Sequence, residues 1–300
     1  MATLYTEQSS NTAKTWLLMT AFLGVVAGLG FFVSIYYNNQ ALFYFAIIFS
    51  FIMNIASFWY SDKIALSLAG AKEIDPVHNV DQLELKRIVE NLAITAGLPT
   101  PRIYIIDDSS PNAFATGRNK KHAAIAVTTG LLSMMDRSEL EGVLAHELSH
   151  IGNRDILLSS AVIVLVGFVS IISDIFLRSM WFGGGRERDD NRGGNPLVII
   201  GIIFIILSPI LATLLQLAIS RKREYLADAT GALITRYPEG LASALEKIAS
   251  TNEPLSHASN ATAHLYISNP FGAKAVKGIS ALFMTHPPIE DRIRILRAGK

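Results

Sequence analysis

Residues 136–155 read DRSELEGVLAHELSHIGNRD, a helical sequence with two histidines on one face. Asp136 and Glu139 have the spacing of an N-terminal capping box, so we expect a helix to begin here. Residues 143–145 are apolar, which predicts that one side of this helix is buried. A fully solvated helix with two surface histidines is therefore the weaker interpretation.

This helix has the pattern of a metal site. His146 and His150 are four residues apart, so both imidazoles can reach one tetrahedral ion. Glu147 lies beside the first histidine, where a carboxylate can take a proton from a water molecule that the metal activates. The chain has no cysteine, so the remaining ligands must be imidazoles or carboxylates.

A catalytic zinc ion of this class needs a third protein ligand, and residues 223–228 (REYLAD) supply a candidate. Glu224 and Asp228 are one helical turn apart and share a face. Glu224 would complete a site of two histidines and one glutamate, and Asp228 could orient an imidazole. Taken alone, the pair would be read as two solvated acids.

Four apolar stretches surround these motifs and account for a composition that is 50% hydrophobic and only 17% charged. Each is close to the roughly 20 residues that a membrane-spanning helix needs. The third contains a single charge, Asp174, and the others contain none. They cover residues 15–37, 41–59, 156–177 and 196–220.

The motifs and stretches predict four segments: a membrane hairpin (1–60), a protease part with the zinc helix (61–155), a second hairpin (156–220), and a protease part with the third ligand (221–300). The second hairpin would return the chain to the face that it left, which brings Glu224 near the histidines. Basic residues 221–223 place both protease parts in the cytoplasm by the positive-inside rule. The loop 178–195 carries four arginines and disagrees, so a shallow second hairpin is the alternative.

The protease parts have the periodicities of helices and short strands. The fold class is therefore mainly α with a small β-sheet (α+β). We expect helices over residues 81–96, 238–250 and 288–298, strands over 102–107, 113–116 and 123–128, and a turn over 117–121.

Four ordered segments of the chain resemble the signatures of HtpX-type membrane zinc metalloproteases. They are residues 110–117, 146–155, 223–228 and 285–293, and the resemblance covers nearly the whole chain. It implies a zincin-like cytoplasmic domain with one Zn²⁺ per chain, in the inner or plasma membrane. It further implies an endopeptidase of the stress response that cleaves damaged or misfolded membrane proteins.

The resemblance also implies roles for single residues. His146, His150 and Glu224 would bind zinc, and Glu147 would act as the general base. Asn153, Asp155 and Asp228 are candidates for holding these ligands, with helix-end capping as the alternative. His286 is a candidate donor to the oxyanion of the tetrahedral intermediate, with capping of the last helix as its alternative. Arg292 is interpreted as a salt-bridging helix residue.

A substrate peptide can add as an extra strand along the edge of a sheet. The hairpin over residues 112–128 offers such an edge, and Asn112, Ala113 and Phe114 are the candidate contacts. A turn role after Pro111 is the alternative for Asn112.

Other functions remain open at this point. A CAAX prenyl endopeptidase shares the zinc motifs, but that family is longer and has more spans. An intramembrane protease would carry its motif within an apolar stretch, whereas here a charged segment (137–141) precedes it. A transporter would need charges along a membrane path, and a zinc-binding scaffold would lack catalysis. A net charge of +1 gives no basic surface for nucleic acid.

Overall fold

The computed structural model describes residues 4–162, 221–251, 254–256, 262, 265–268, 270 and 287–298. Most of the third predicted membrane stretch, the whole of the fourth and the arginine-rich loop between them lie outside these residues. His286 lies outside them as well. The predictions made for these parts of the chain therefore stay predictions.

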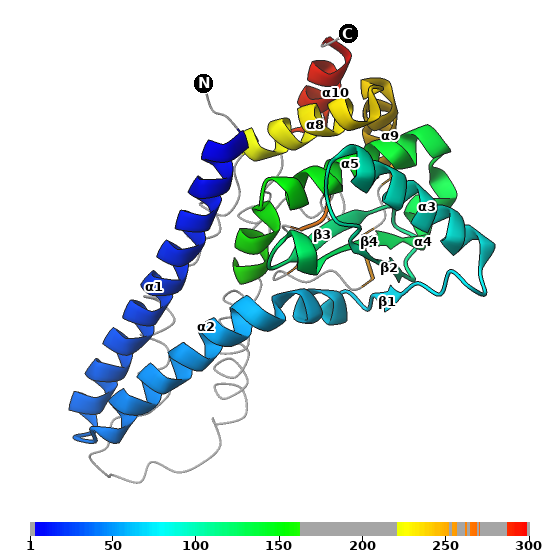
Figure 1. The fold of residues 1–300 in the computed structure, drawn as a ribbon. Helices are drawn as coiled ribbons and strands as arrows, with labels where there is room; N and C mark the ends of the chain where they lie inside the picture. Colours follow the sequence, from blue (N-terminus) through cyan, green and yellow to red (C-terminus); the bar gives the residue numbers. More distant parts are fainter. Residues whose placement is uncertain are drawn as a thin grey trace.

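Two long helices, α1 (Leu4–Tyr36) and α2 (Ala41–Leu68), form a hairpin that projects from the body of the protein (Figure 1). Both are long and apolar enough to cross a membrane. Their most apolar windows are only 33% and 11% buried, which differs from the core helix of a soluble protein. The described residues thus contain two candidate membrane helices, at the positions of the first two predicted stretches.

Both helices extend beyond the apolar stretches that predicted them. The last turns of α2 continue past Trp59, and there Asp62, Ala65 and Leu66 are buried. Asp62 forms an ion pair of 2.7 Å with Arg102 of the sheet. Hydropathy marks the part of a helix that suits lipid, not the helix end, so the expected boundary at residue 60 falls inside α2.

The sheet has four strands in the order β1-β2-β4-β3. Strands β2 and β4 are parallel, and the other two pairs are antiparallel. The three predicted strands are confirmed, and the expected turn overlaps the short helix η1 (Lys120–His122). The missed strand, β1, has only two residues, too few for a periodicity. The strands are β1 (Lys72–Glu73), β2 (Arg102–Ile106), β3 (Ala113–Gly117) and β4 (Ala123–Thr128).

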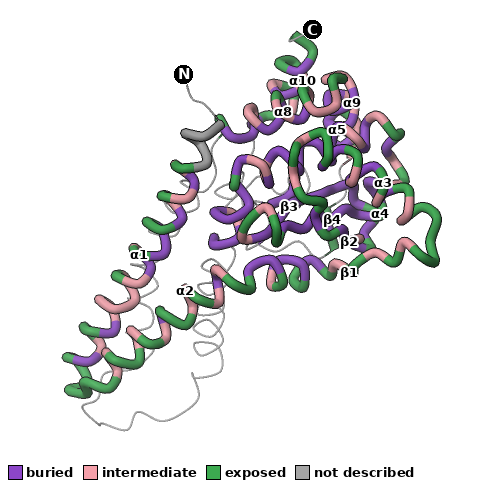
Figure 2. The backbone as a smooth tube through the Cα atoms, in the orientation of Figure 1, coloured by how far each residue is buried: buried purple, intermediate pink, exposed green. Residues whose placement is uncertain are grey.

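Helices cover one face of this sheet, and the membrane hairpin reaches the other (Figure 1). Ala115 and Ile125 face the helices, whereas Phe114 and Ala126 face the end of α2 and part of α1. Every residue of β4 is consequently buried, and Figure 2 shows the buried centre against the exposed far end of the hairpin. The helices of the first face are α3 (Val80–Thr95), α4 (Thr129–Met134), α5 (Arg137–Gly152), α8 (Arg221–Thr235), α9 (Pro238–Ser250) and α10 (Ile289–Ala298).

The helix that carries the two histidines begins as expected. The Asp136 side chain accepts a hydrogen bond of 2.9 Å from the main-chain N–H of Glu139. In return, the Glu139 carboxylate accepts one of 2.8 Å from the main-chain N–H of Asp136. This capping box fixes the start of α5, and with it the direction in which both histidines point.

Candidate metal centre

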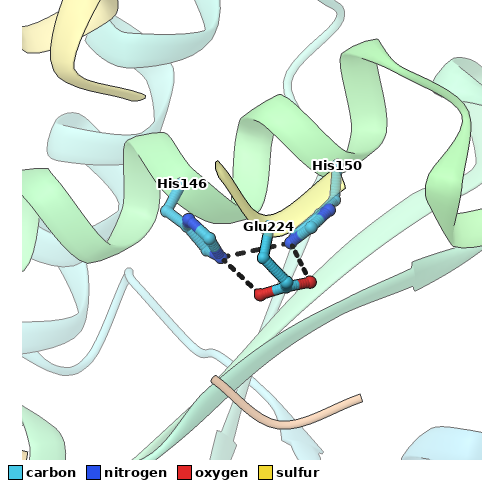
Figure 3. A group of neighbouring side chains, drawn as sticks. All are labelled: His146, His150 and Glu224. Atoms are coloured by element: carbon cyan, nitrogen blue, oxygen red, sulfur yellow. Dashed lines mark hydrogen bonds and ion pairs between the residues drawn. The ribbon is translucent and has the colours of Figure 1, made fainter. Parts of the chain in front are cut away.

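Two adjacent helices supply the three predicted ligands. His146 and His150 are on α5, Glu224 is on α8, and their ligand atoms all lie within 4.8 Å of one another (Figure 3). The helices approach closely because Gly231 of α8 lies against the main chain of His146. The expectation that Glu224 comes beside the two histidines is confirmed.

The spacing of the ligand atoms is close to that around a tetrahedral ion. The two Nε2 atoms are 3.1 Å apart, and each lies 3.7–3.8 Å from an oxygen of Glu224. Ligand atoms about 2.0–2.2 Å from a tetrahedral zinc ion are separated by roughly 3.3–3.6 Å. The observed distances lie on both sides of that range.

Each histidine is held by an aspartate through its other ring nitrogen. His146 Nδ1 lies 2.9 Å from Asp228 Oδ1, and His150 Nδ1 lies 2.9 Å from Asp155 Oδ2. With Nδ1 donating, each Nε2 presents its lone pair to the cluster. Two Nε2 atoms 3.1 Å apart beside a carboxylate need a positive charge among them, which either a proton shared by the two rings or a bound cation supplies. The donor set therefore fits a divalent cation.

Asp155 reaches back to His150 because the chain reverses after α5. Asn153 caps the helix, and Arg154 adopts a left-handed conformation with φ 61°. Asn153 was also a candidate for holding the ligands. Its side-chain oxygen and nitrogen are buried and have no hydrogen-bond partner among the described residues. The side chain of Asp155 therefore contacts a predicted ligand, His150, whereas the side chain of Asn153 does not.

Arg292 of α10 is the largest fully buried side chain of the described residues and lies at the site. It donates two hydrogen bonds, of 2.8 and 2.7 Å, to the two oxygens of Asp228. Its Nη1 lies 3.9 Å from Glu224 and donates to the main-chain oxygen of Ile267. The expected salt bridge of Arg292 is therefore present, but it lies at the metal centre and not on the surface of a helix.

The charges around the cluster set the pKa values of its members. Burial raises the pKa of Glu147 to about 7, which His150 and a main-chain hydrogen bond from Ala115 partly oppose. Burial alone would also raise the pKa of Asp228, but Arg292 and His146 hold it at about 2. Glu147 thus has the proton affinity of a base that works near neutral pH, whereas Asp228 stays a carboxylate.

The three candidate substrate contacts lie on or next to β3, the edge strand. Phe114 is fully buried and packs edge-to-face on Tyr266, with ring centroids 5.2 Å apart. The Asn112 amide lies 3.3 Å from the main-chain and side-chain oxygens of Ser268. Ala113 O accepts a hydrogen bond of 3.1 Å from Ile267 N. The side chains of Asn112 and Phe114 thus contact other residues of the protein. A substrate strand at this edge would meet the main chain of β3.

One residue at the site was missed altogether. Asn11 of α1 is 1% exposed, and its amide donates a hydrogen bond of 2.6 Å to Asp155. In the sequence it precedes the first apolar stretch and belongs to no motif. No local signal points to it, because its partners lie more than a hundred residues away along the chain.

Known protein families resemble this chain over most of its length. The model of peptidase family M48 matches residues 79–300. A protease HtpX homolog from Thermoanaerobacter pseudethanolicus is 50% identical over 301 residues, which cover 99% of this chain and 98% of that protein. Another from Caldanaerobacter subterraneus subsp. tengcongensis is 48% identical over 305 residues, with 99% and 98% covered. One from Streptococcus gordonii is 42% identical over 98% of this chain and 99% of its own length.

A solved structure shares the fold. The crystal structure of S. mikatae Ste24p superposes with a TM-score of 0.50 at 20% sequence identity. The match covers 97% of this chain and 66% of that one, so the chain spans about two thirds of the length of that protein.

Proposed function

Since the chain belongs to peptidase family M48, we propose that His146, His150 and Glu224 bind one zinc ion, at which Glu147 acts as general base in peptide hydrolysis. The protein is a membrane metalloprotease, like its HtpX relatives. One observation carries the assignment of the zinc ligands. Two imidazole nitrogens and a carboxylate converge on one point, and each imidazole is held by its own aspartate.

When bound, the zinc ion would act as a Lewis acid toward water and the scissile carbonyl. Glu147 then takes the proton of the attacking water and passes it to the leaving amine. Its pKa of about 7 suits both transfers near neutral pH. Asp155 and Asp228 keep the Nδ1 protons in place, so both histidines present Nε2. Arg292 in turn keeps Asp228 ionised.

We propose that substrate binds as an extended strand along β3. The main-chain oxygen of Ala113 already accepts a hydrogen bond from Ile267 of the same chain, so a substrate strand would pair with the part of β3 that follows Ala113. Glu147 receives a main-chain hydrogen bond from Ala115 of the same strand, which places the base beside it. Main-chain pairing accepts many sequences, as a protease of misfolded proteins requires.

We further propose that His286 donates to the oxyanion of the tetrahedral intermediate. It shortly precedes α10, and Arg292 of that helix contacts both Asp228 and Glu224. We also propose that Asn153 helps to hold the ligands, through its main-chain oxygen, which accepts a hydrogen bond from Asn11.

Aromatic residues mark both ends of the membrane hairpin. Exposed Trp16 and Trp59 lie at the end near the sheet, and exposed Tyr36 lies at the far end. From Trp16 to Tyr36 the helix rises about 30 Å, the thickness of a hydrocarbon core. The Arg118 guanidinium lies 4.3 Å from the centre of the Trp59 ring, as expected where lipid meets water.

We therefore propose that the metal centre lies on the cytoplasmic side, close above the bilayer surface. The basic residues 221–223 at the start of α8 support this side. Asn11 contacts the site, and Trp16, only slightly later in α1, lies at the proposed membrane interface. This short separation supports a metal centre close to the bilayer surface. A site at this height meets the loops and juxtamembrane segments of membrane proteins, which we propose as substrates in the cell membrane.

The test compares two glutamates on the same helix. Purified wild-type protein in detergent should hold about one zinc ion per chain and cleave an unfolded polypeptide. Glu147→Gln should keep the zinc and lose at least about 10²–10⁴-fold in rate. Glu141 lies on a more exposed face of α5, so Glu141→Gln should keep both the zinc and the cleavage rate. His146→Ala should lose both.

Two results would overturn the proposal. Proteolysis retained by Glu147→Gln would exclude Glu147 as the base. Zinc bound by wild-type protein that cleaves no polypeptide would favour a zinc-binding scaffold instead.

A further inference from the structure

The N-terminal end of α1, a candidate membrane helix, reaches the metal centre. Asn11 of α1 is 1% exposed although it lies only slightly before the exposed Trp16. In Figure 1 the beginning of α1 lies beside the beginning of α8, the helix of Glu224. A polar amide in this buried position needs hydrogen-bond partners, and its partners identify what it does.

The Asn11 amide joins three parts of the chain. Its Nδ2 donates to Asp155 Oδ1 at 2.6 Å and lies 3.2 Å from the main-chain oxygen of Asn153. Its Oδ1 accepts from Arg223 Nη1 at 3.4 Å. Both ends of one side chain are thus used, one on the turn after α5 and the other on α8.

One of these bonds leads to a ligand through a single intervening side chain. Asp155 receives Asn11 on Oδ1 and His150 on Oδ2, so both of its oxygens are engaged. The bond from Asn11 therefore selects the carboxylate orientation that meets the His150 ring. On the other side, the bond from Arg223 ties the beginning of α8 to α1.

We propose that Asn11 is a positioning residue for the metal centre, acting through Asp155 on His150. This inference rests on the proposed function, because it requires that the three residues bind zinc. It makes the first membrane helix a part of the site: the position of α1 sets the geometry of the ligands. A residue that only packed α1 against the body would affect stability but not the affinity of the folded protein for zinc.

The chain offers a matched control in Asn54 of α2. Its amide likewise ties the hairpin together, with Nδ2 donating to the main-chain oxygen of Met19 at 3.2 Å, and it touches no ligand. The variants are Asn11→Ala, Asn11→Leu, which keeps the size of the side chain, and Asn54→Ala. Each is made in the full chain, purified in detergent, and checked for folding by thermal unfolding.

Zinc affinity is measured by competition with a chelator, and cobalt is used in place of zinc to record ligand-field absorption. Loss of a residue that orients a ligand typically costs 10–100-fold in metal affinity. Because Asn11 acts on His150 through Asp155, we expect Asn11→Ala and Asn11→Leu to bind zinc about 10-fold more weakly than wild type, at the lower end of this range. We also expect them to change the cobalt spectrum, and Asn54→Ala to match wild type in both measurements.

The outcomes separate the two proposals. If wild-type protein binds no zinc, the proposed function fails, and this inference fails with it. If wild type binds zinc and folded Asn11 variants bind it equally well with an unchanged cobalt spectrum, the positioning role is wrong and the proposed function stands. An equal loss in Asn54→Ala would also contradict it, because the effect would then come from a loosened hairpin.

Discussion

The two ligand histidines differ in the charge that their surroundings favour. Burial lowers the pKa of His146 to about 4, and the nearby Arg292 adds to this against the opposing effect of Asp228. Burial would also lower the pKa of His150, but Asp155 and Glu224 raise it to about 9. In the metal-free protein at neutral pH, His146 is therefore neutral and His150 carries a proton.

This difference predicts how zinc affinity depends on pH. Below pH about 9, zinc must displace the proton of His150, so the apparent affinity should rise about tenfold per pH unit and level off near pH 9. At pH 7 it should be about 100-fold below that plateau. His146 should contribute no slope above pH 5. Competition with a chelator between pH 6 and 10 measures the curve, and a flat curve would contradict it.

Arg292 is expected to matter more for stability than any surface arginine of α10. Replacing it with Met leaves the buried Asp228 carboxylate without its cationic partner, which typically costs about 3–5 kcal/mol. Arg294→Met on the same helix removes an exposed pair with Asp291 and should cost no more than about 1 kcal/mol. Thermal unfolding of the zinc-free variants measures both, and similar losses would contradict the prediction.

At the scale of elements, the helices that carry the ligands are packed through glycines. A Cβ atom at Gly142 of α5 would lie 2.6 Å from the main-chain nitrogen of Leu241 in α9. One at Gly231 of α8 would lie 3.0 Å from the main-chain nitrogen of His146. Backbones this close hold α8 and α9 against α5, the helix that carries the two histidines.

Gly142→Ala should therefore destabilise the protein. Alanine normally improves a helix by about 1 kcal/mol over glycine. Here it forces α5 and α9 apart, and overpacking of this kind costs about 1–3 kcal/mol. Gly28→Ala in α1 is the control, because a Cβ there meets nothing within 4 Å. A lower melting temperature for Gly142→Ala alone is expected, and equal melting temperatures would show that α9 adjusts freely.

At the scale of the whole molecule, the membrane hairpin and the protease part form one packed unit. The end of α2 and part of α1 complete the second face of the sheet through Phe22, Ala65 and Leu66. Asn11 connects the same hairpin to the site. We therefore expect a change in the tilt of the hairpin to move both the sheet and the residues of the metal centre.

The orientation of this unit in the membrane can be tested directly, because the chain contains no cysteine. Asn39→Cys lies at the turn of the hairpin, and Lys121→Cys is exposed on the protease part. A membrane-impermeant maleimide added to intact cells should label only Asn39→Cys, and Lys121→Cys should react only after lysis. Labelling of Lys121→Cys alone would invert the topology, and labelling of both would mean that the hairpin does not cross.

The sequence by itself determined the features that depend on local spacing. The four-residue spacing of His146 and His150 puts both on one face of any α-helix, and the capping box sets where that helix begins. Composition alone marked the two described membrane helices, and Pro238 marked the start of α9 at the observed residue. Each of these signals comes from residues within one or a few turns of one another.

Only the tertiary structure decided which polar side chains are buried at the site. An arginine in a short amphipathic helix and an asparagine before an apolar stretch look solvated in sequence. Arg292 can be buried because it hydrogen-bonds Asp228, 64 positions away in the chain. Asn11 can be buried because it hydrogen-bonds Asp155, 144 positions away. Burial of a charge or an amide depends on partners that folding brings together, and no local pattern encodes such partners.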